Sequence, residues 1–207
     1  MQTIRYLVIK NITIMKNLQT MNFGAQQPQI QFPSQTRCLL LVNERKVGRK
    51  AMDMEGNESE EIITSYDYDG TFLDVTAQTE AAVLEAVKST VLKEIEQYDS
   101  SPAVNGFLLN GSVEWIDIDL RVKLCTRTLP EEKKAGNTST VLWLGNKPYE
   151  LPIETIEQIM HEIEIYAKAC LDVTNSHKAK VLTLSDVSAL VAYDYTAGYP
   201  EKLSFNI

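Results

Sequence analysis

Histidine and cysteine supply most of the acid–base and nucleophilic groups that act near neutral pH, and this sequence has few of either. Its 207 residues include two histidines, His161 and His177, and three cysteines, Cys38, Cys125 and Cys170. The cysteines have no close spacing, so neither a disulfide framework nor a Cys-x-x-Cys metal site is indicated. We expect three free thiols in a reducing environment.

Motifs for catalysis are also missing. The sequence contains no glycine-rich phosphate loop and no G-x-S-x-G, H-E-x-x-H or C-x-x-C pattern. Cys170 and His177 share one helical stripe, but seven residues of α-helix separate them by about 10.5 Å, too far to share a proton or a metal ion. His161, nine residues before Cys170, fails in the same way. We expect no catalytic residue, no cofactor, no bound metal and no enzymatic activity.

A basic surface and a membrane-spanning segment are missing too. The formal net charge is −8, which disfavours binding to nucleic acid. The only basic cluster consists of Arg45, Lys46, Arg49 and Lys50. An acidic run up to Glu61 follows it directly, so we interpret the pair of runs as a solvated hairpin or loop. No stretch reaches the roughly 18 apolar residues that cross a bilayer, and residues 1–15 lack the cleavage site of a signal peptide. We expect neither nucleic acid nor membrane as a partner.

The strongest pattern present is a stripe of apolar or small residues between Pro152 and Leu184. Its members recur every three or four residues, as on one face of an α-helix: Ile156, Ile159, Met160, Ile163, Tyr166, Ala167, Cys170, Val173, His177, Val181 and Leu184. The spacing predicts a helix about 45 Å long. A helix of this length either backs a sheet and extends past it or packs against copies of itself.

Several strands precede this helix. The continuous apolar run Cys38–Glu44 predicts a buried strand. Strands are also predicted over 62–66 and 72–75, joined by a turn at Asp67–Gly70, because Asp-Gly is a hairpin signal. Asp67, Asp69 and Asp74 resemble part of a calcium loop, but the other oxygen ligands and the closing glutamate of such a loop are missing.

Two shorter helices are predicted upstream of the long one, and a third follows it. Thr76 is a good N-cap for a helix from Ala77 to about Tyr98. A helix from Ile118 to about Thr128 is expected to break at Pro130, because proline cannot donate the next backbone hydrogen bond. A short helix is predicted from Ser185 to about Tyr193.

Two hairpins are indicated by turns at Asn110-Gly111 and Gly145-Asn146. They carry three large aromatic residues, Trp115, Trp143 and Tyr149. These side chains either fill the space between sheet and helix or form a platform for a sugar or a peptide. The first alternative is the commoner one for aromatic residues on hairpins.

The N-terminal residues, 1–36, are treated as a strand followed by an arm or linker. Residues 3–15 alternate as a β-strand does, although Met15 or Met21 could also be the true start. Residues 16–36 contain six glutamines and few apolar residues, so this segment cannot fold alone. It is either a disordered tail or an arm that orders against a neighbouring subunit.

Together these elements predict an α+β protein, in which antiparallel β-hairpins pack against helices, with one long C-terminal helix and an extended N-terminal arm. Residues 37–207 are expected to form a single α+β domain, with a last short strand near 201–205. We expect a homo-oligomer whose interface includes apolar residues of the arm and of the long helix: Phe23, Ile30, Phe32, Ile156, Ile163, Tyr166, Cys170 and His177.

The sequence from about residue 94 to 207 resembles an uncharacterised domain of phages and prophages in Bacteroidales and other bacteria, often encoded near tail and tail-fibre genes. The resemblance is carried in order by Tyr98-Asp99-Ser100-Ser101, Val104-Asn105-Gly106-Phe107, Asn110-Gly111, Trp115-Ile116-Asp117, Arg121-Val122, Leu142-Trp143, Ile163–Ala167 with Cys170, Val173-Thr174, His177–Ala179 and Tyr193–Leu203. It covers about half the chain and brings no known catalytic residue.

The resemblance implies a tailed-phage setting. We expect a structural virion protein, assembled in the host cytoplasm, that acts as an adaptor or ring subunit at the tail, the head–tail connector or the fibre attachment point. Its partners would be other phage structural proteins. Two alternatives remain: a cytoplasmic assembly chaperone for tail fibres, and a module that binds carbohydrate or the host surface through the hairpin aromatics.

Overall fold

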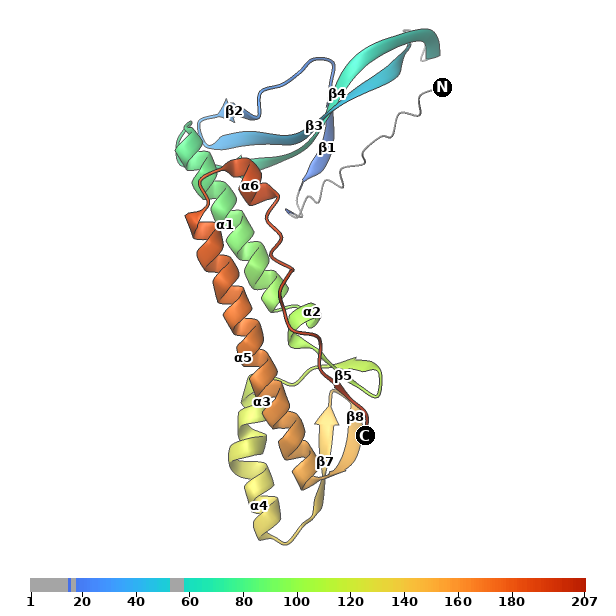
Figure 1. Ribbon diagram of the computed structural model, residues 1–207, viewed down its shortest axis with the longest axis vertical. Helices are drawn as coiled ribbons and strands as arrows, with labels where there is room; N and C mark the ends of the chain where they lie inside the picture. Colours follow the sequence, from blue (N-terminus) through green and yellow to red (C-terminus); the bar gives the residue numbers. More distant parts are fainter. Residues whose placement is uncertain (1–14, 16–17, 53–57) are drawn as a thin grey trace, which may run out of the picture. The chain divides into compact units, whose positions relative to one another are not determined.

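The structure is a computed structural model that describes residue 15, residues 18–52 and residues 58–207. It confirms the α+β class and the long C-terminal helix (Figure 1). The chain divides into two compact units, Met1–Glu94 with Lys180–Tyr195 (unit 1) and Ile95–Ala179 with Thr196–Ile207 (unit 2). Residues 37–207, which were expected to form one domain, are divided between these two units.

Unit 1 contains a four-stranded antiparallel sheet. Its strands are β1 (Gln19–Phe23), β2 (Ile30–Ser34), β3 (Arg37–Met52) and β4 (Glu58–Asp74), in the order β1-β4-β3-β2. Residues 16–36 were expected to be either a disordered tail or an arm that orders against a neighbouring subunit. Part of this segment instead forms two strands of the chain's own sheet. Phe23 packs edge-on against Tyr68, with 5.7 Å between ring centroids, and the Gln27 amide donates a 2.8 Å hydrogen bond to the Tyr68 hydroxyl. Of the strand expected over 3–15, all but Met15 lies outside the described residues.

The turn predicted at Asp67–Gly70 is wrong, because β4 runs through it as one strand. Gly70 is needed for packing here and not for a turn: a Cβ on Gly70 would lie 2.7 Å from Leu41 Cδ2 and 2.9 Å from Met21 Sδ. The carboxylate of Asp67 is bound by Arg49, and that of Asp69 by Arg45. These two members of the fragment that resembles a calcium loop therefore serve as ion-pair partners within the sheet.

Helix α1 (Glu80–Asp99) begins later than predicted, because Thr79 and not Thr76 caps it. The Thr79 hydroxyl accepts a hydrogen bond of 3.2 Å from the Ala82 amide. In unit 1, Val83, Val87 and Val91 are buried along one stripe of α1. The short helix α6 (Val187–Val191) is capped by the Asp186 side chain, one residue after the predicted cap.

Unit 2 contains both predicted two-residue hairpins. β5 (Phe107–Leu109) pairs with β6 (Ser112–Glu114), and β7 (Ser139–Leu144) pairs with β8 (Lys147–Pro152). Asn110 and Gly111 have φ of 49° and 77°, the left-handed conformation that this turn requires. The predicted last strand is present as β9 (Ser204–Phe205), which adds to β5 in parallel.

The predicted break at Pro130 is wrong. Helix α3 (Ile118–Lys123), the π-helical turn η1 (Leu124–Thr128) and helix α4 (Leu129–Lys134) follow one another without leaving helical backbone angles. The Leu129 amide donates to the Leu124 carbonyl, five residues earlier, so the helix widens just before the proline. This wide turn lets the helical path continue past a residue that has no amide hydrogen to donate. After α4, a short turn leads through Asn137 into β7.

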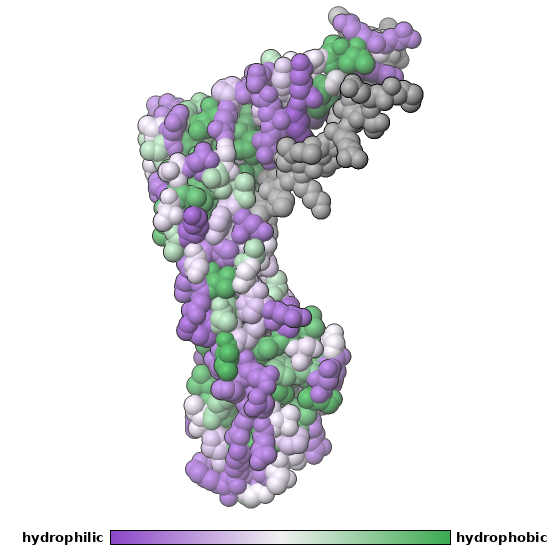
Figure 2. Space-filling view, viewed as in Figure 1, coloured by the Kyte–Doolittle hydropathy of each residue, from purple (hydrophilic) through white to green (hydrophobic). Residues whose placement is uncertain are grey.

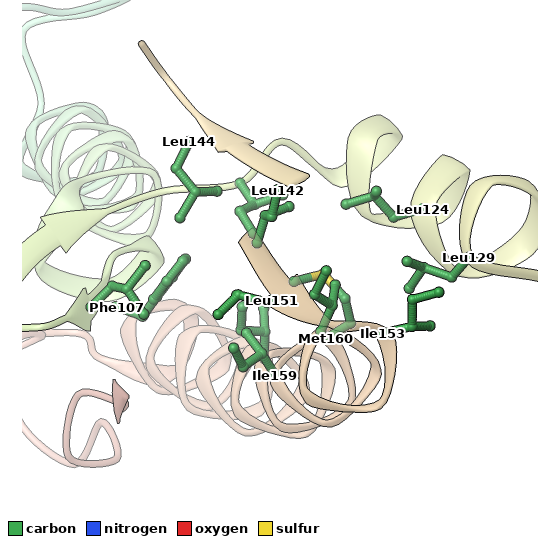
Figure 3. Close-up of a cluster of buried hydrophobic side chains, with 13 residues drawn as sticks. Phe107, Leu124, Leu129, Leu142, Leu144, Leu151, Ile153, Ile159 and Met160 are labelled. Atoms are coloured by element: carbon green, nitrogen blue, oxygen red, sulfur yellow. The ribbon is translucent and has the colours of Figure 1, made fainter. Parts of the chain in front are cut away.

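The core of unit 2 is built on the stripe of helix α5 (Ile153–Thr183), where both predicted ends are within one residue. Figure 3 shows its side chains meeting those of the hairpins, of η1 and of α4. The buried cluster comprises Phe107, Leu109, Ile116, Leu124, Leu129, Leu142, Leu144, Leu151, Ile153, Ile156, Ile159, Met160 and Ile163. In unit 2 the stripe therefore covers strands of its own chain, which is the first of the two arrangements expected for so long a helix.

Candidate functional site

The reactive side chains of α5 are held in packing contacts. Cys170 is buried beside Val104 and Tyr166, and burial raises the pKa of the Cys170 thiol and of the Tyr166 phenol. His177 stacks on Tyr199 at 5.8 Å, and its Nε2 lies 2.9 Å from the Ala197 carbonyl oxygen. No group of three His, Cys, Asp or Glu side chains in the described ranges is arranged to hold a metal ion. A protonated, buried thiol is a poor nucleophile.

A second buried polar group lies between α3 and α5 in unit 2. Arg121 pairs with Glu164 at 3.0 Å and borders a cavity of about 30 Å³, together with Trp115 and Tyr166. A buried water molecule needs about 10–15 Å³ of such space. The cavity therefore has room for about two water molecules and is too small for an organic substrate.

The feature of unit 1 best placed for binding is the far part of the β3–β4 hairpin (Figure 1). β1 pairs with β4 only between Tyr66 and Gly70, and β2 pairs with β3 only between Arg37 and Leu40. Residues 47–52 and 58–65 form a two-stranded ribbon beyond these strands, which we call the distal hairpin. In the part of the chain that the structure describes, neither outer edge of this ribbon has a strand partner.

The distal hairpin has exposed hydrophobic surface, drawn in green in Figure 2. Ile62 is 71% exposed and Ile63 is 46% exposed. They are consecutive in β4, so they lie on opposite faces of the ribbon. An open strand edge with exposed isoleucines promotes pairing with another chain, and soluble proteins generally protect such edges. The combination therefore indicates a protein-binding element.

The base of the distal hairpin is clamped by ion pairs across β3 and β4. The Arg45 guanidinium donates to both oxygens of Asp69, at 3.0 and 2.7 Å. The Arg49 guanidinium donates to Asp67 at 2.7 and 2.8 Å, and Asn22 of β1 donates to the same carboxylate at 2.7 Å. These charge-assisted bonds fix the twist of the ribbon where it leaves the sheet.

The clamp makes this end of the sheet sensitive to acid. The hydrogen bond from Asn22 and the nearby Arg49 guanidinium hold the pKa of Asp67 below its usual range. A depressed carboxyl pKa stabilises the fold above the unfolded value of about 3.9, and this contribution is lost as the pH falls through the folded pKa. We expect wild type to lose more stability than Asp67→Asn between pH 5 and pH 2. Urea unfolding at a series of pH values measures this difference, and parallel curves would show that Asp67 contributes nothing.

The predicted interface residues of α5 lie inside the chain. Ile156 and Ile163 belong to the unit 2 core, Tyr166 and Cys170 to the smaller cluster beside it. His177 is half-buried against Tyr199. The three residues predicted on the N-terminal arm, Phe23, Ile30 and Phe32, are half-buried strand residues in unit 1.

Other exposed residues differ from the sequence interpretation. Trp115 and Trp143 are 58% and 57% exposed, whereas Tyr149 is half-buried, with its hydroxyl 3.4 Å from Glu114. The packing interpretation therefore fits Tyr149 and does not fit the two tryptophans. Ile62 and Ile63 were not among the residues predicted to be exposed. Their adjacency was the available signal, because two consecutive strand residues cannot both face a single core.

Comparisons with protein-family models, with curated proteins and with solved structures give no match to this chain. Among the residues that the structure describes, no helix combines the length and the apolar character needed to cross a membrane.

Proposed function

We propose that this chain is a non-catalytic structural protein of a tailed-bacteriophage particle, and that it joins other protein chains through its distal hairpin. The observation that carries the proposal is the two-stranded ribbon, which has no strand partner among residues 18–52 and 58–207 and on which Ile62 and Ile63 are exposed. The phage setting rests on the sequence resemblance of residues 94–207. An adaptor or ring subunit at the tail, the connector or the fibre attachment point would need such an element.

The energetics of strand pairing suit a stable contact of this kind. An added strand supplies a hydrogen-bond partner for each outward backbone amide and carbonyl on the edge. Side chains on both faces of the ribbon also become more buried. Complete burial of an isoleucine contributes about 1.5–3 kcal/mol relative to exposure. Eight residues of β4, from Glu58 to Ser65, would offer an edge about 26 Å long.

Mass spectrometry of purified, washed phage particles tests the proposal. We expect peptides of this chain at a stoichiometry similar to that of other minor structural proteins. If the chain is found bound to fibre protein in infected-cell lysate but not in washed particles, it is an assembly chaperone. Absence from the particles would end the structural proposal.

A second candidate function is favoured by the exposure of Trp115 and Trp143. An exposed indole offers a flat apolar face on which a sugar ring can stack. A host-surface module would bind carbohydrate on a glycan array and lose that binding in Trp115→Ala or Trp143→Ala. A blank array would eliminate this candidate.

A further inference from the structure

We infer that unit 2 binds a hexopyranose at Trp115, with the sugar ring stacked on the exposed indole and its hydroxymethyl group inserted in the cavity beside Arg121. The inference rests on the second candidate function given above, carbohydrate binding, because it names the sugar class and assigns the site to one of the two exposed tryptophans. All the residues that form the site, from Val104 to Cys170, belong to unit 2.

Arg121 contributes a buried hydrogen-bond donor to this site. Its side chain is 12% exposed, and its Nη1 lies 3.0 Å from a carboxylate oxygen of Glu164. The Nε–H of the same guanidinium is buried and has no hydrogen-bond partner among the residues that the structure describes. A buried donor without a partner is unfavourable, and a water molecule or a ligand atom commonly supplies the acceptor. Because Arg121 borders the cavity, an oxygen atom placed there is the acceptor that this geometry favours.

The size and the lining of the cavity limit what can enter it. Its volume of about 30 Å³ has room for about two water molecules, and the carbon and oxygen of a hydroxymethyl group need a similar space. Phe107 and Ile163 are buried and give the cavity apolar walls. A hydroxymethyl group matches this lining, since its carbon contacts the apolar walls while its oxygen accepts from the Arg121 Nε–H. The rest of the sugar remains outside the cavity.

Trp115 supplies a flat surface at the edge of the same cavity. It borders the cavity and is nevertheless 58% exposed. The next residue, Ile116, is buried in the core of unit 2, which fixes the backbone at Trp115. The C–H face of a pyranose can stack on such an indole. Asn105 is also exposed and borders the cavity, and its amide can both donate to and accept from the ring hydroxyls of the sugar.

Trp143 is the matched comparison, because it is 57% exposed and also lies on a hairpin. The residue opposite it in the β7–β8 pair is Pro148, which has no amide hydrogen to donate. An apolar surface binds many ligands, whereas a few well-placed polar groups beside it provide specificity. The polar groups of Asn105 and Arg121 therefore assign sugar binding to Trp115 and not to Trp143.

Titration of the full chain with simple glycosides tests the inference. The probes are methyl glucoside and methyl galactoside, each compared with the pentoside that lacks its hydroxymethyl group, methyl xyloside and methyl arabinoside. The Trp143→Phe variant keeps Trp115 as its only tryptophan, so a change in indole fluorescence reports this site. We expect a Kd of roughly 1–10 mM for at least one hexoside. Its pentoside should bind about tenfold more weakly.

Four substitutions separate the contributions to binding. Trp115→Ala should abolish it, whereas Trp143→Ala should bind as wild type does. Arg121→Lys keeps a positive charge beside Glu164 but removes the Nε–H, and should weaken hexoside binding about tenfold. Ala167→Leu fills the cavity without changing a polar group, and should remove the preference for the hexoside. Saturation-transfer NMR on the sugars compares these chains, and circular dichroism with thermal unfolding checks that each is folded.

Three outcomes would overturn the inference: equal binding of hexosides and pentosides, hexoside binding that persists in a folded Trp115→Ala variant, and full hexoside preference in Ala167→Leu. Loss of binding in Trp143→Ala alone would keep carbohydrate binding and remove the site assigned to Trp115. If no sugar binds in the titrations or on the glycan array, the second candidate function is removed together with this inference. The structural role is judged separately, by the presence of the chain in washed particles.

Discussion

Replacing Ile156 with alanine is expected to lower the free energy of unfolding of unit 2 by about 3 kcal/mol. Ile156 has no exposed surface and lies in the cluster that joins α5 to the two hairpins, to η1 and to α4. Truncating such a side chain removes the free energy of its burial and leaves a cavity, which together cost about 2–5 kcal/mol for isoleucine. Tryptophan fluorescence during urea unfolding measures the loss, because Trp115 and Trp143 are the only tryptophans and both are in unit 2.

Ile165→Ala is the matched control, since it makes the same change on the same helix. Ile165 is 59% exposed, so its truncation is expected to change the free energy of unfolding by less than about 0.5 kcal/mol. If both substitutions had the same effect, the buried stripe of α5 would be assigned to the wrong face of the helix. If Ile165→Ala were the more costly one, the exposed face would be covered in solution by another chain.

Trimming the distal hairpin is expected to leave a folded chain that no longer associates with its partners. Lys46 and Tyr66 are paired across β3 and β4, so residues 47–65 can be replaced by Asn-Gly, the preferred two-residue turn for a hairpin. Asp69 keeps Arg45, and Asp67 keeps its hydrogen bond from Asn22. We expect the melting temperature to change by only a few degrees, since the deleted ribbon contributes little to the buried core.

Loss of association in the trimmed chain should be nearly complete, because both edges and both exposed isoleucines are removed together. Size-exclusion chromatography with light scattering compares it with wild type at equal concentration. Circular dichroism and thermal unfolding check that the trimmed chain is folded. If the trimmed chain associates as wild type does, the interface lies on another surface, such as the exposed apolar residues of α3.

The local patterns that predicted this fold correctly are those whose physical cause is also local. The stripe from Ile156 to Val181 and the Asn110-Gly111 turn depend on helical periodicity and on backbone angles, and both are found as predicted. The Asp69-Gly70 turn was wrong because the requirement for glycine comes from Leu41 and Met21, which approach from neighbouring strands. A single sequence does not distinguish a glycine needed for φ from one needed for space.

The predictions for Pro130 and for the N-terminal segment were wrong for related reasons. A proline usually ends a helix, but a π-helical turn at Leu124–Thr128 accommodates this one. The glutamine-rich segment has too little apolar surface to fold alone, and it is ordered because β3 and β4 provide edges for β1 and β2. In both cases tertiary context outweighs local preference.

Only part of the candidate site could be predicted from the sequence. The basic run at 45–50 and the acidic run that follows it were interpreted as a solvated hairpin or loop. The basic run lies in β3, and Glu58, Glu60 and Glu61 of the acidic run lie in β4. What the runs alone do not reveal is that β1 and β2 do not extend along the ribbon, so no strand that the structure describes pairs with its edges. Exposure of Trp115 and Trp143 likewise depends on which face of each hairpin meets α5.

Quantitative mass spectrometry of washed particles, assembled with either the wild-type chain or the chain trimmed at 47–65, tests the central claim most directly. We predict that wild type is incorporated and that the trimmed chain, although folded and present in the lysate at the same level, is reduced at least tenfold in the particles. Equal incorporation of the two chains would contradict the claim that the distal hairpin attaches this protein to its neighbours.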